Sequence, residues 1–207
     1  RNTITLAAAC MAGTAVLGSQ LTVLGLGARA GPVFAGIAAV LWLVLTYGIL
    51  MALTIQEDKP GLAEGISGGW LLTVVSTQSI AVVAALLASH AAEPARLALN
   101  FGALALWLCG GMLYVWVISL IFYRYAFLRF VPQDLTLTYW INMGAMAISA
   151  LAGALLVMNA PGTPFLQDLR PFLVGGTVLF WAVGTWWIPM QAALAVWRYV
   201  HRRYPLR

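Results

Sequence analysis

Six long stretches of the chain contain no Asp, Glu, Lys, Arg or His, and each is long enough to cross a membrane. A helix of about 20 apolar residues spans the ~30 Å hydrocarbon core of a bilayer and satisfies its own backbone hydrogen bonds there. Only 8% of residues are charged, against about a quarter in soluble proteins. The sequence therefore predicts an all-α integral membrane protein with six transmembrane helices. The uncharged stretches are Thr5–Gly27, Val33–Ile55, Ile66–Ser89, Leu97–Tyr123, Leu137–Met158 and Phe172–Trp197.

The six stretches alternate in aromatic content. The first, third and fifth contain none, one and two aromatic residues, whereas the second, fourth and sixth contain three, six and six. Small and hydroxyl residues suit close helix packing, and Trp and Tyr suit contact with lipid and its interfaces. The alternation predicts three hairpins, each pairing a slim inner helix with a bulky outer helix that faces lipid. Residues 1–207 then form one transmembrane domain. Because the chain starts at Arg1 without an initiator Met, we expect this domain to be incomplete at its N-terminus.

Basic residues are distributed unequally between the two sets of helix ends. One set carries eight Lys and Arg residues, including Lys59 and Arg124, and the other carries three. Positive residues collect on the cytoplasmic side of membrane proteins. We therefore expect a multi-pass protein of the cell membrane with both visible termini in the cytoplasm. The net charge of +5 mostly reflects this bias, although it would also attract anions to the inner mouth.

Polar and small residues share faces of the first and third stretches. Thr14 and Gly18 lie four residues apart, and Trp70, Thr73 and Thr77 share one face of the third stretch, with Gln78 on its flank. Small residues at this spacing allow close helix packing, and hydroxyls can bond the backbone of their own helix. A buried amide needs a partner across a helix interface or a watery path. Packing and the lining of a solute path both remain open for these residues.

The fifth stretch has two faces that compete for the same role. Asn142, Ala145, Ser149 and Gly153 form a polar face, and Trp140, Gly144, Ala147 and Leu151 form nearly the opposite one. Polarity points the first face towards a pore, but that face would equally suit a seam against a neighbouring helix.

The six stretches contain none of the residue combinations that enzymes use for catalysis. His90 and His201 lie outside the six stretches, which excludes a histidine pair for haem, and no Lys lies within a stretch to form a Schiff base. Paired carboxylates and metal-ligand spacings are also missing there. We expect no enzyme activity, no cofactor, no metal ion and no nucleic-acid partner.

The stretches EGISGGWLLTVVSTQSIAV (Glu64–Val82) and YWINMGAMAISALAGA (Tyr139–Ala154) resemble the tellurite-resistance and C4-dicarboxylate transporter family, which includes the plant slow anion channel. The segments Cys10–Gln20 and Phe122–Thr136 add weaker similarity. This resemblance implies ten helices in five hairpins, with inner helices around one anion path per subunit, and a homo-oligomer that is usually a trimer. The six predicted helices would be the last six of the ten.

The resemblance also implies a place for the anion path. Relatives plug the path with a Phe that aligns, through Trp140, with Gly144 here. The resemblance thus turns the Gly144 face towards the path and favours a transporter without an aromatic plug. We predict transport of C4-dicarboxylates, tellurite or sulfite along the first, third and fifth helices. The alternative is a non-transporting anchor or assembly subunit of a membrane redox complex. The predicted path residues are Thr14, Gly18, Trp70, Thr73, Thr77, Gln78, Trp140, Asn142 and Gly144.

Overall fold

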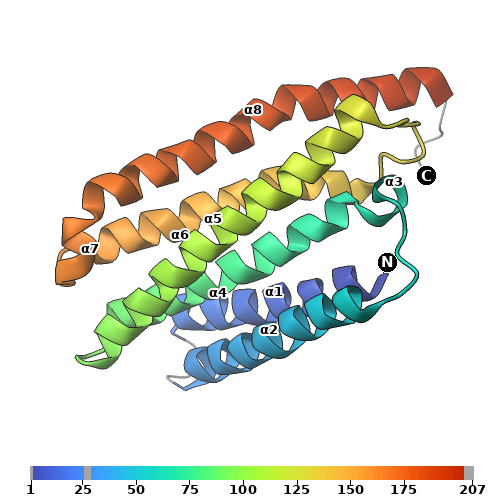
Figure 1. Cartoon of the computed structure of the whole chain (residues 1–207). Coiled ribbons are helices and arrows are strands. Elements are labelled where there is room, and N and C mark those ends of the chain that lie inside the picture. The colour runs from blue at the N-terminus through green and yellow to red at the C-terminus, as the bar shows by residue number, and fades with distance from the viewer. Residues whose placement is uncertain (1, 26–28, 203–207) are drawn as a thin grey trace.

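The fold consists of long helices that run back and forth side by side (Figure 1). A computed structural model describes residues 2–25 and 29–202, and every regular element within those ranges is helical. Six of the described helices are long and apolar enough to cross a membrane, which confirms the predicted fold class. These helices are α1 (Asn2–Val23), α2 (Ala30–Ile55), α4 (Leu71–His90), α5 (Ala95–Phe127), α6 (Ile141–Asn159) and α8 (Arg170–Arg202).

Short helical turns precede two of the three inner helices, α4 and α6. The 3-10 turn η1 (Gly68–Trp70) precedes α4, and η2 (Leu137–Trp140) precedes α6. The two turns pack against each other. A Cβ atom on Gly68 would collide with the backbone of Thr138 and Tyr139, so only glycine permits this approach. The short helices α3 (Leu62–Gly65) and α7 (Pro164–Asp168) lie in connections. The predicted end of the first helix, at Gly27, lies outside the described residues.

Consecutive long helices pair as hairpins, and the first helix of each pair is the more buried. The pairs are α1 with α2, α4 with α5, and α6 with α8. In their apolar segments, 28% of residues are buried in α1 against 6% in α2, 67% in α4 against 33% in α5, and 39% in α6 against 17% in α8. The predicted arrangement of three inner and outer hairpins is therefore confirmed.

Helix α4 is the central helix of the fold. It packs against α1, α2, α5 and α6, and its buried residues include the hydroxyl and amide run Ser76–Ser79. Figure 1 shows α1 and α6 on opposite sides of α4. The described parts of α1 and α6 make no extensive contact with each other. The three inner helices thus form an open row, with α4 in the middle and one side of α1 and α6 uncovered.

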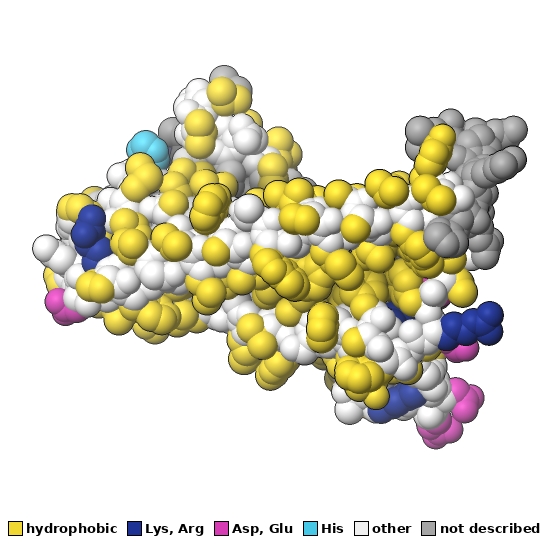
Figure 2. Space-filling view, turned by 90° about the horizontal axis from the view of Figure 1, so that it is seen from above, with side chains coloured by type: hydrophobic (Ala, Val, Ile, Leu, Met, Phe, Trp, Pro, Cys, Tyr) yellow, Lys and Arg dark blue, Asp and Glu magenta, His cyan; other side chains and the backbone are white. Residues whose placement is uncertain are grey.

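Many aromatic residues of the outer helices lie on the surface, as expected, but Trp107, Tyr114 and Trp187 are buried. Trp116 is 60% exposed and Trp181 64% exposed. On the face in Figure 2, apolar side chains cover the long helices and charges gather at the two ends. Trp107 is only 1% exposed. Glycines on two neighbouring helices make room for its ring, because a Cβ atom would lie 3.1 Å from it at Gly153 and 2.6 Å from it at Gly176.

Candidate functional site

The uncovered side of α6 is made of small and apolar residues. Gly144 and Ala147 are exposed, and Leu151 on the same face is 50% exposed. A Cβ atom on Gly144 would meet no atom within 4 Å. On α1, Gly13 is likewise exposed with open space beside it. At Gly13 and Gly144, an added side chain would therefore meet no obstacle within the described part of the chain.

The polar side of α6 is buried in a seam with its neighbours. Asn142 accepts a hydrogen bond of 2.9 Å from the Tyr114 hydroxyl on α5. The backbone carbonyl of Ser149 accepts another of 2.9 Å from the Trp107 indole. Ala145 is also buried here, and Gly153 lies against Thr177 of α8. Of the two readings of this face, the seam against neighbouring helices is the one found. Its polarity serves interhelical bonding, and Asn142 itself is 3% exposed.

The polar residues of α4 are likewise engaged in contacts between or within helices. The Gln78 side-chain amide donates a 3.0 Å hydrogen bond to the Trp107 carbonyl on α5. The Thr77 hydroxyl donates to the carbonyl of Thr73 at 2.8 Å and accepts from the Trp42 indole on α2 at 2.8 Å. Both residues have no exposed surface. Thr77 and Gln78 thus tie α4 to the outer helices on its two sides.

The remaining predicted residues range from half-buried to buried. On α4, Thr73 donates to the Trp70 carbonyl at 2.7 Å, and the Trp70 indole donates to the Gly65 carbonyl at 3.0 Å. On α1, Thr14 bonds the backbone of its own helix at 2.8 Å. Gly18 is buried, and a Cβ atom there would lie 3.2 Å from the Phe34 Cβ atom on α2. Gly18 therefore serves the close approach of the first hairpin.

The nine predicted path residues consequently fall into three groups by exposure. Whether any of them contacts a solute stays a prediction. Gly144 is exposed, Thr14, Trp70, Thr73 and Trp140 are half-buried, and Gly18, Thr77, Gln78 and Asn142 are buried.

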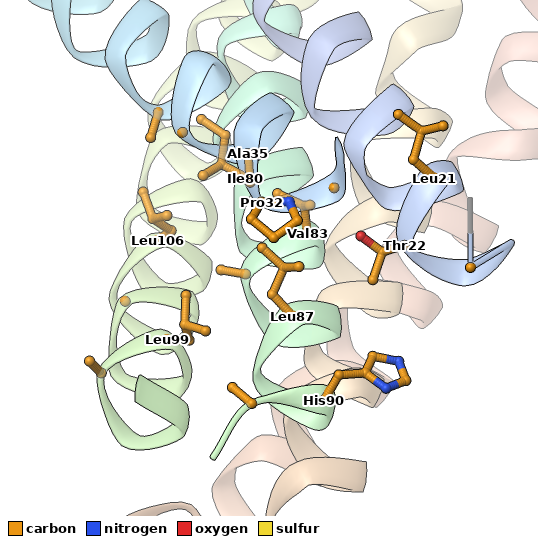
Figure 3. Close-up of a pocket in the computed structure, with 18 residues that line it drawn as sticks. Leu21, Thr22, Pro32, Ala35, Ile80, Val83, Leu87, His90, Leu99 and Leu106 are labelled. Carbon is orange, nitrogen blue, oxygen red and sulfur yellow. The ribbon is translucent and has the colours of Figure 1, made fainter. Parts of the chain in front are cut away.

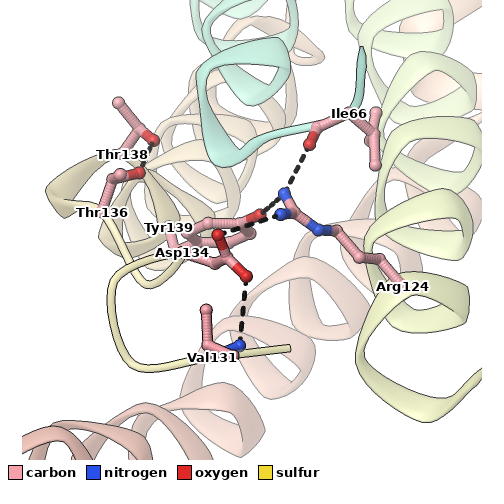
Figure 4. Close-up of polar contacts among 7 residues, drawn as sticks. All are labelled: Ile66, Arg124, Val131, Asp134, Thr136, Thr138 and Tyr139. Carbon is pink, nitrogen blue, oxygen red and sulfur yellow. Dashed lines mark hydrogen bonds and ion pairs between the residues drawn. The ribbon is translucent and has the colours of Figure 1, made fainter. Parts of the chain in front are cut away.

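Arg124 forms a buried cationic site, a role that neither the basic bias nor the similarity of Phe122–Thr136 predicts. Its guanidinium donates to the Ile66 carbonyl at 2.7 Å and to the Tyr139 hydroxyl at 2.5 Å, and one nitrogen lies 3.8 Å from a carboxylate oxygen of Asp134 (Figure 4). The guanidinium carbon also lies 5.4 Å from the centre of the Phe130 ring. Arg124 is 4% exposed. The sequence feature that could have indicated this site is the run of aromatic residues around Arg124, at positions 122–127.

Arg124 also lines a polar cavity where several elements begin or end. The cavity has a volume of about 290 Å³. Its lining includes the buried Arg124 and four Ser or Thr residues, and the Asp134 carboxylate offsets part of the positive charge. The site lies at the helix ends that the basic bias assigns to the cytoplasm. Its lining residues are Thr5, Ser67, Arg124, Gln133, Asp134, Thr136 and Thr138.

Comparison with known proteins gives one family and several relatives. An uncharacterized membrane protein of Mycobacterium tuberculosis is 43% identical over 95 residues, which cover 46% of this chain and 48% of the relative. An uncharacterized transporter of Methanocaldococcus jannaschii is 23% identical over 197 residues, which cover 93% of this chain and 53% of the relative. The chain spans about half the length of these curated relatives. No solved structure gives a significant match.

The family match extends over almost the whole chain. The sequence profile of the voltage-dependent anion channels matches residues 3–206. This match agrees with the resemblance carried by Glu64–Val82 and Tyr139–Ala154. The chain belongs to the voltage-dependent anion channel family.

Proposed function

We propose that the six helices form part of a path for small anions that runs along the uncovered side of α1, α4 and α6. The observation that carries the proposal is the arrangement of α6. Its polar residues are used in the seam with neighbouring helices, whereas the Gly144 face is smooth and open. A path needs space, and this face leaves space without exposing buried hydrogen-bonding groups.

The chemistry of the path favours weak and non-specific contact with the anion. The exposed faces of α1 and α6 carry no charged side chain in the described part of their apolar segments. An anion would meet small side chains, part-buried hydroxyls such as that of Thr73, and the positive N-terminal ends of α4 and α6. Arg124 and the hydroxyl-lined cavity near it would attract anions to the inner mouth. Small organic or inorganic acids, including C4-dicarboxylates, tellurite and sulfite, fit this chemistry.

The protein would act as a homo-oligomer in the cell membrane with the visible termini in the cytoplasm. In this arrangement the cavity at Arg124 opens towards the cytoplasm. Because each subunit has its own open face on α1 and α6, we place one path within each subunit.

Flux measurements on the full-length protein test the proposal. The protein is reconstituted into liposomes, and uptake of malate, succinate, chloride, tellurite and sulfite is compared with that of protein-free liposomes. We expect saturable or conductive flux of at least one of these anions. Absence of flux for all five, with co-purification of a cofactor-bearing soluble protein, would instead support the anchor or assembly subunit.

A further inference from the structure

We propose that the groove between α2 and α5 holds one acyl chain of a phospholipid. The groove is a cavity of about 910 Å³ (Figure 3). Helix α4, which packs against both α2 and α5, contributes Ile80, Val83 and Leu87 to its lining. Gly36 of α2 and Gly102 of α5 line it from the two outer helices. This inference is independent of the proposed anion path, which lies on the uncovered side of α1 and α6.

The lining of the groove suits hydrocarbon and little else. Thr22 and His90 are the two lining residues with polar side chains. The Thr22 hydroxyl already donates to the Gly18 carbonyl at 2.8 Å, and His90 is the last residue of α4, at one end of the groove. A polar solute in the deeper part would lose its hydration without gaining hydrogen bonds. An empty groove between two outer helices would leave its walls without dispersion contacts.

The depth of the groove matches one leaflet of a bilayer. On α4 the lining runs from Ile80 to His90, which is about 15 Å of helix at a rise of 1.5 Å per residue. This is about half of the ~30 Å hydrocarbon core. On α2 the lining ends at Ala39, in the first half of a helix that continues to Ile55. A transmembrane helix of a second copy would need a groove along the full length of α2 and α5, so an acyl chain fits better.

A basic residue next to the groove in the sequence suits a phospholipid headgroup. Arg29 is exposed directly before α2, two residues before the lining residue Gly31, and His90 at the end of α4 lines the same groove. A guanidinium at this level can bond a lipid phosphate. The basic bias places this end outside the cell, so the lipid belongs to the outer leaflet.

Photo-crosslinking with a defined lipid tests the inference. The full-length protein is placed in nanodiscs that contain phosphatidylglycerol with a diazirine in the middle of one acyl chain. After illumination, labelled peptides are identified by mass spectrometry. We expect labelling to concentrate on the groove segments of α2, α4 and α5. Gly36→Phe should lower that labelling several-fold, because the ring fills the groove and a Cβ atom at Gly36 meets nothing within 4 Å.

Matched variants separate this result from other causes. Gly48→Phe places the same ring on another exposed and unobstructed position of α2 and should leave groove labelling unchanged. If Gly36→Phe fails to fold, Gly102→Phe on α5 provides the same test from the other wall, since it also has open space. Unchanged groove labelling in a folded Gly36→Phe or Gly102→Phe variant would overturn the proposal. An unlabelled groove in the wild-type protein would also overturn the proposal. If the Phe variants then dissociate the oligomer, the groove is occupied by a second copy of the chain.

Discussion

At the scale of single residues, the glycines of α6 show that one residue type serves two opposite purposes. A Cβ atom on Gly153 would collide with the Thr177 hydroxyl and lie 3.1 Å from the Trp107 ring. A Cβ atom on Gly144 would meet nothing within 4 Å. Gly153 therefore permits the contact of α6 with α8 and α5, whereas Gly144 leaves open space at one point of an exposed face. Substitutions at the two positions should consequently have different effects.

Enlarging Gly144 should reduce transport without unfolding the protein. We expect Gly144→Phe to lower anion flux strongly, because its ring would project into the proposed path, while Gly144→Ala adds one methyl group and keeps most of the flux. The measurement is liposome uptake at equal protein abundance, with detergent chromatography as a check of folding. As a contrast, Gly153→Ala should lower the melting temperature. Wild-type flux in a well-folded Gly144→Phe protein would show that this face is not the path.

Arg124 should matter more for stability than a basic residue on the surface nearby. Replacing it by Gln leaves the buried Ile66 carbonyl without its 2.7 Å hydrogen bond, and a buried unsatisfied group costs about 1–3 kcal/mol. Arg129 is exposed, so Arg129→Gln should change stability by less than about 0.5 kcal/mol. Thermal unfolding of the two variants in the same detergent makes the comparison. Equal melting temperatures would mean that water replaces the guanidinium in the Arg124 variant.

At the scale of helices, hydropathy and aromatic content were sufficient to predict the hairpins, but not which faces pack together. Both faces of α6 consist largely of small residues, so composition alone does not separate them. Which face is buried depends on hydrogen bonds from another helix, because Tyr114 and Trp107 of α5 donate to Asn142 and Ser149. These contacts link residues far apart in the sequence and leave no local pattern. Polarity alone therefore pointed Asn142 towards a pore, whereas it lies in a helix seam.

The seam between α4 and α5 should show strong coupling between Gln78 and Gly110. A Cβ atom on Gly110 would lie 2.5 Å from the Gln78 side-chain nitrogen. We expect Gly110→Ala to destabilise the wild type but to cost less in a Gln78→Ala background, where that side chain is shortened. The cost of Gly110→Ala in unfolding free energy should differ between the two backgrounds by roughly 0.5–3 kcal/mol, the range seen for contacting residues. Additive effects in a double-mutant cycle would show that the seam adjusts without the contact.

At the scale of the whole molecule, the eight-to-three distribution of basic residues predicts the direction of insertion. Single cysteines at Ala92 and Pro161, both exposed, should react with an impermeant thiol reagent from outside intact cells. A cysteine at Asp58 should react only after the membrane is opened. The background replaces Cys10 and Cys109, the two free cysteines. If, in intact cells, the cysteine at position 58 reacts and those at positions 92 and 161 do not, the protein has the opposite topology.

The hydrogen bond of Gln78 has a consequence for how the protein is made. Its acceptor, the Trp107 carbonyl, lies 29 residues later in the chain. At a synthesis rate of about 5–20 residues per second, that acceptor leaves the ribosome about 1.5–6 s after Gln78. During this interval the amide of α4 must remain in water or beside the insertion machinery, because hydrocarbon offers it no partner. We therefore expect α4 and α5 to enter the bilayer together as one hairpin.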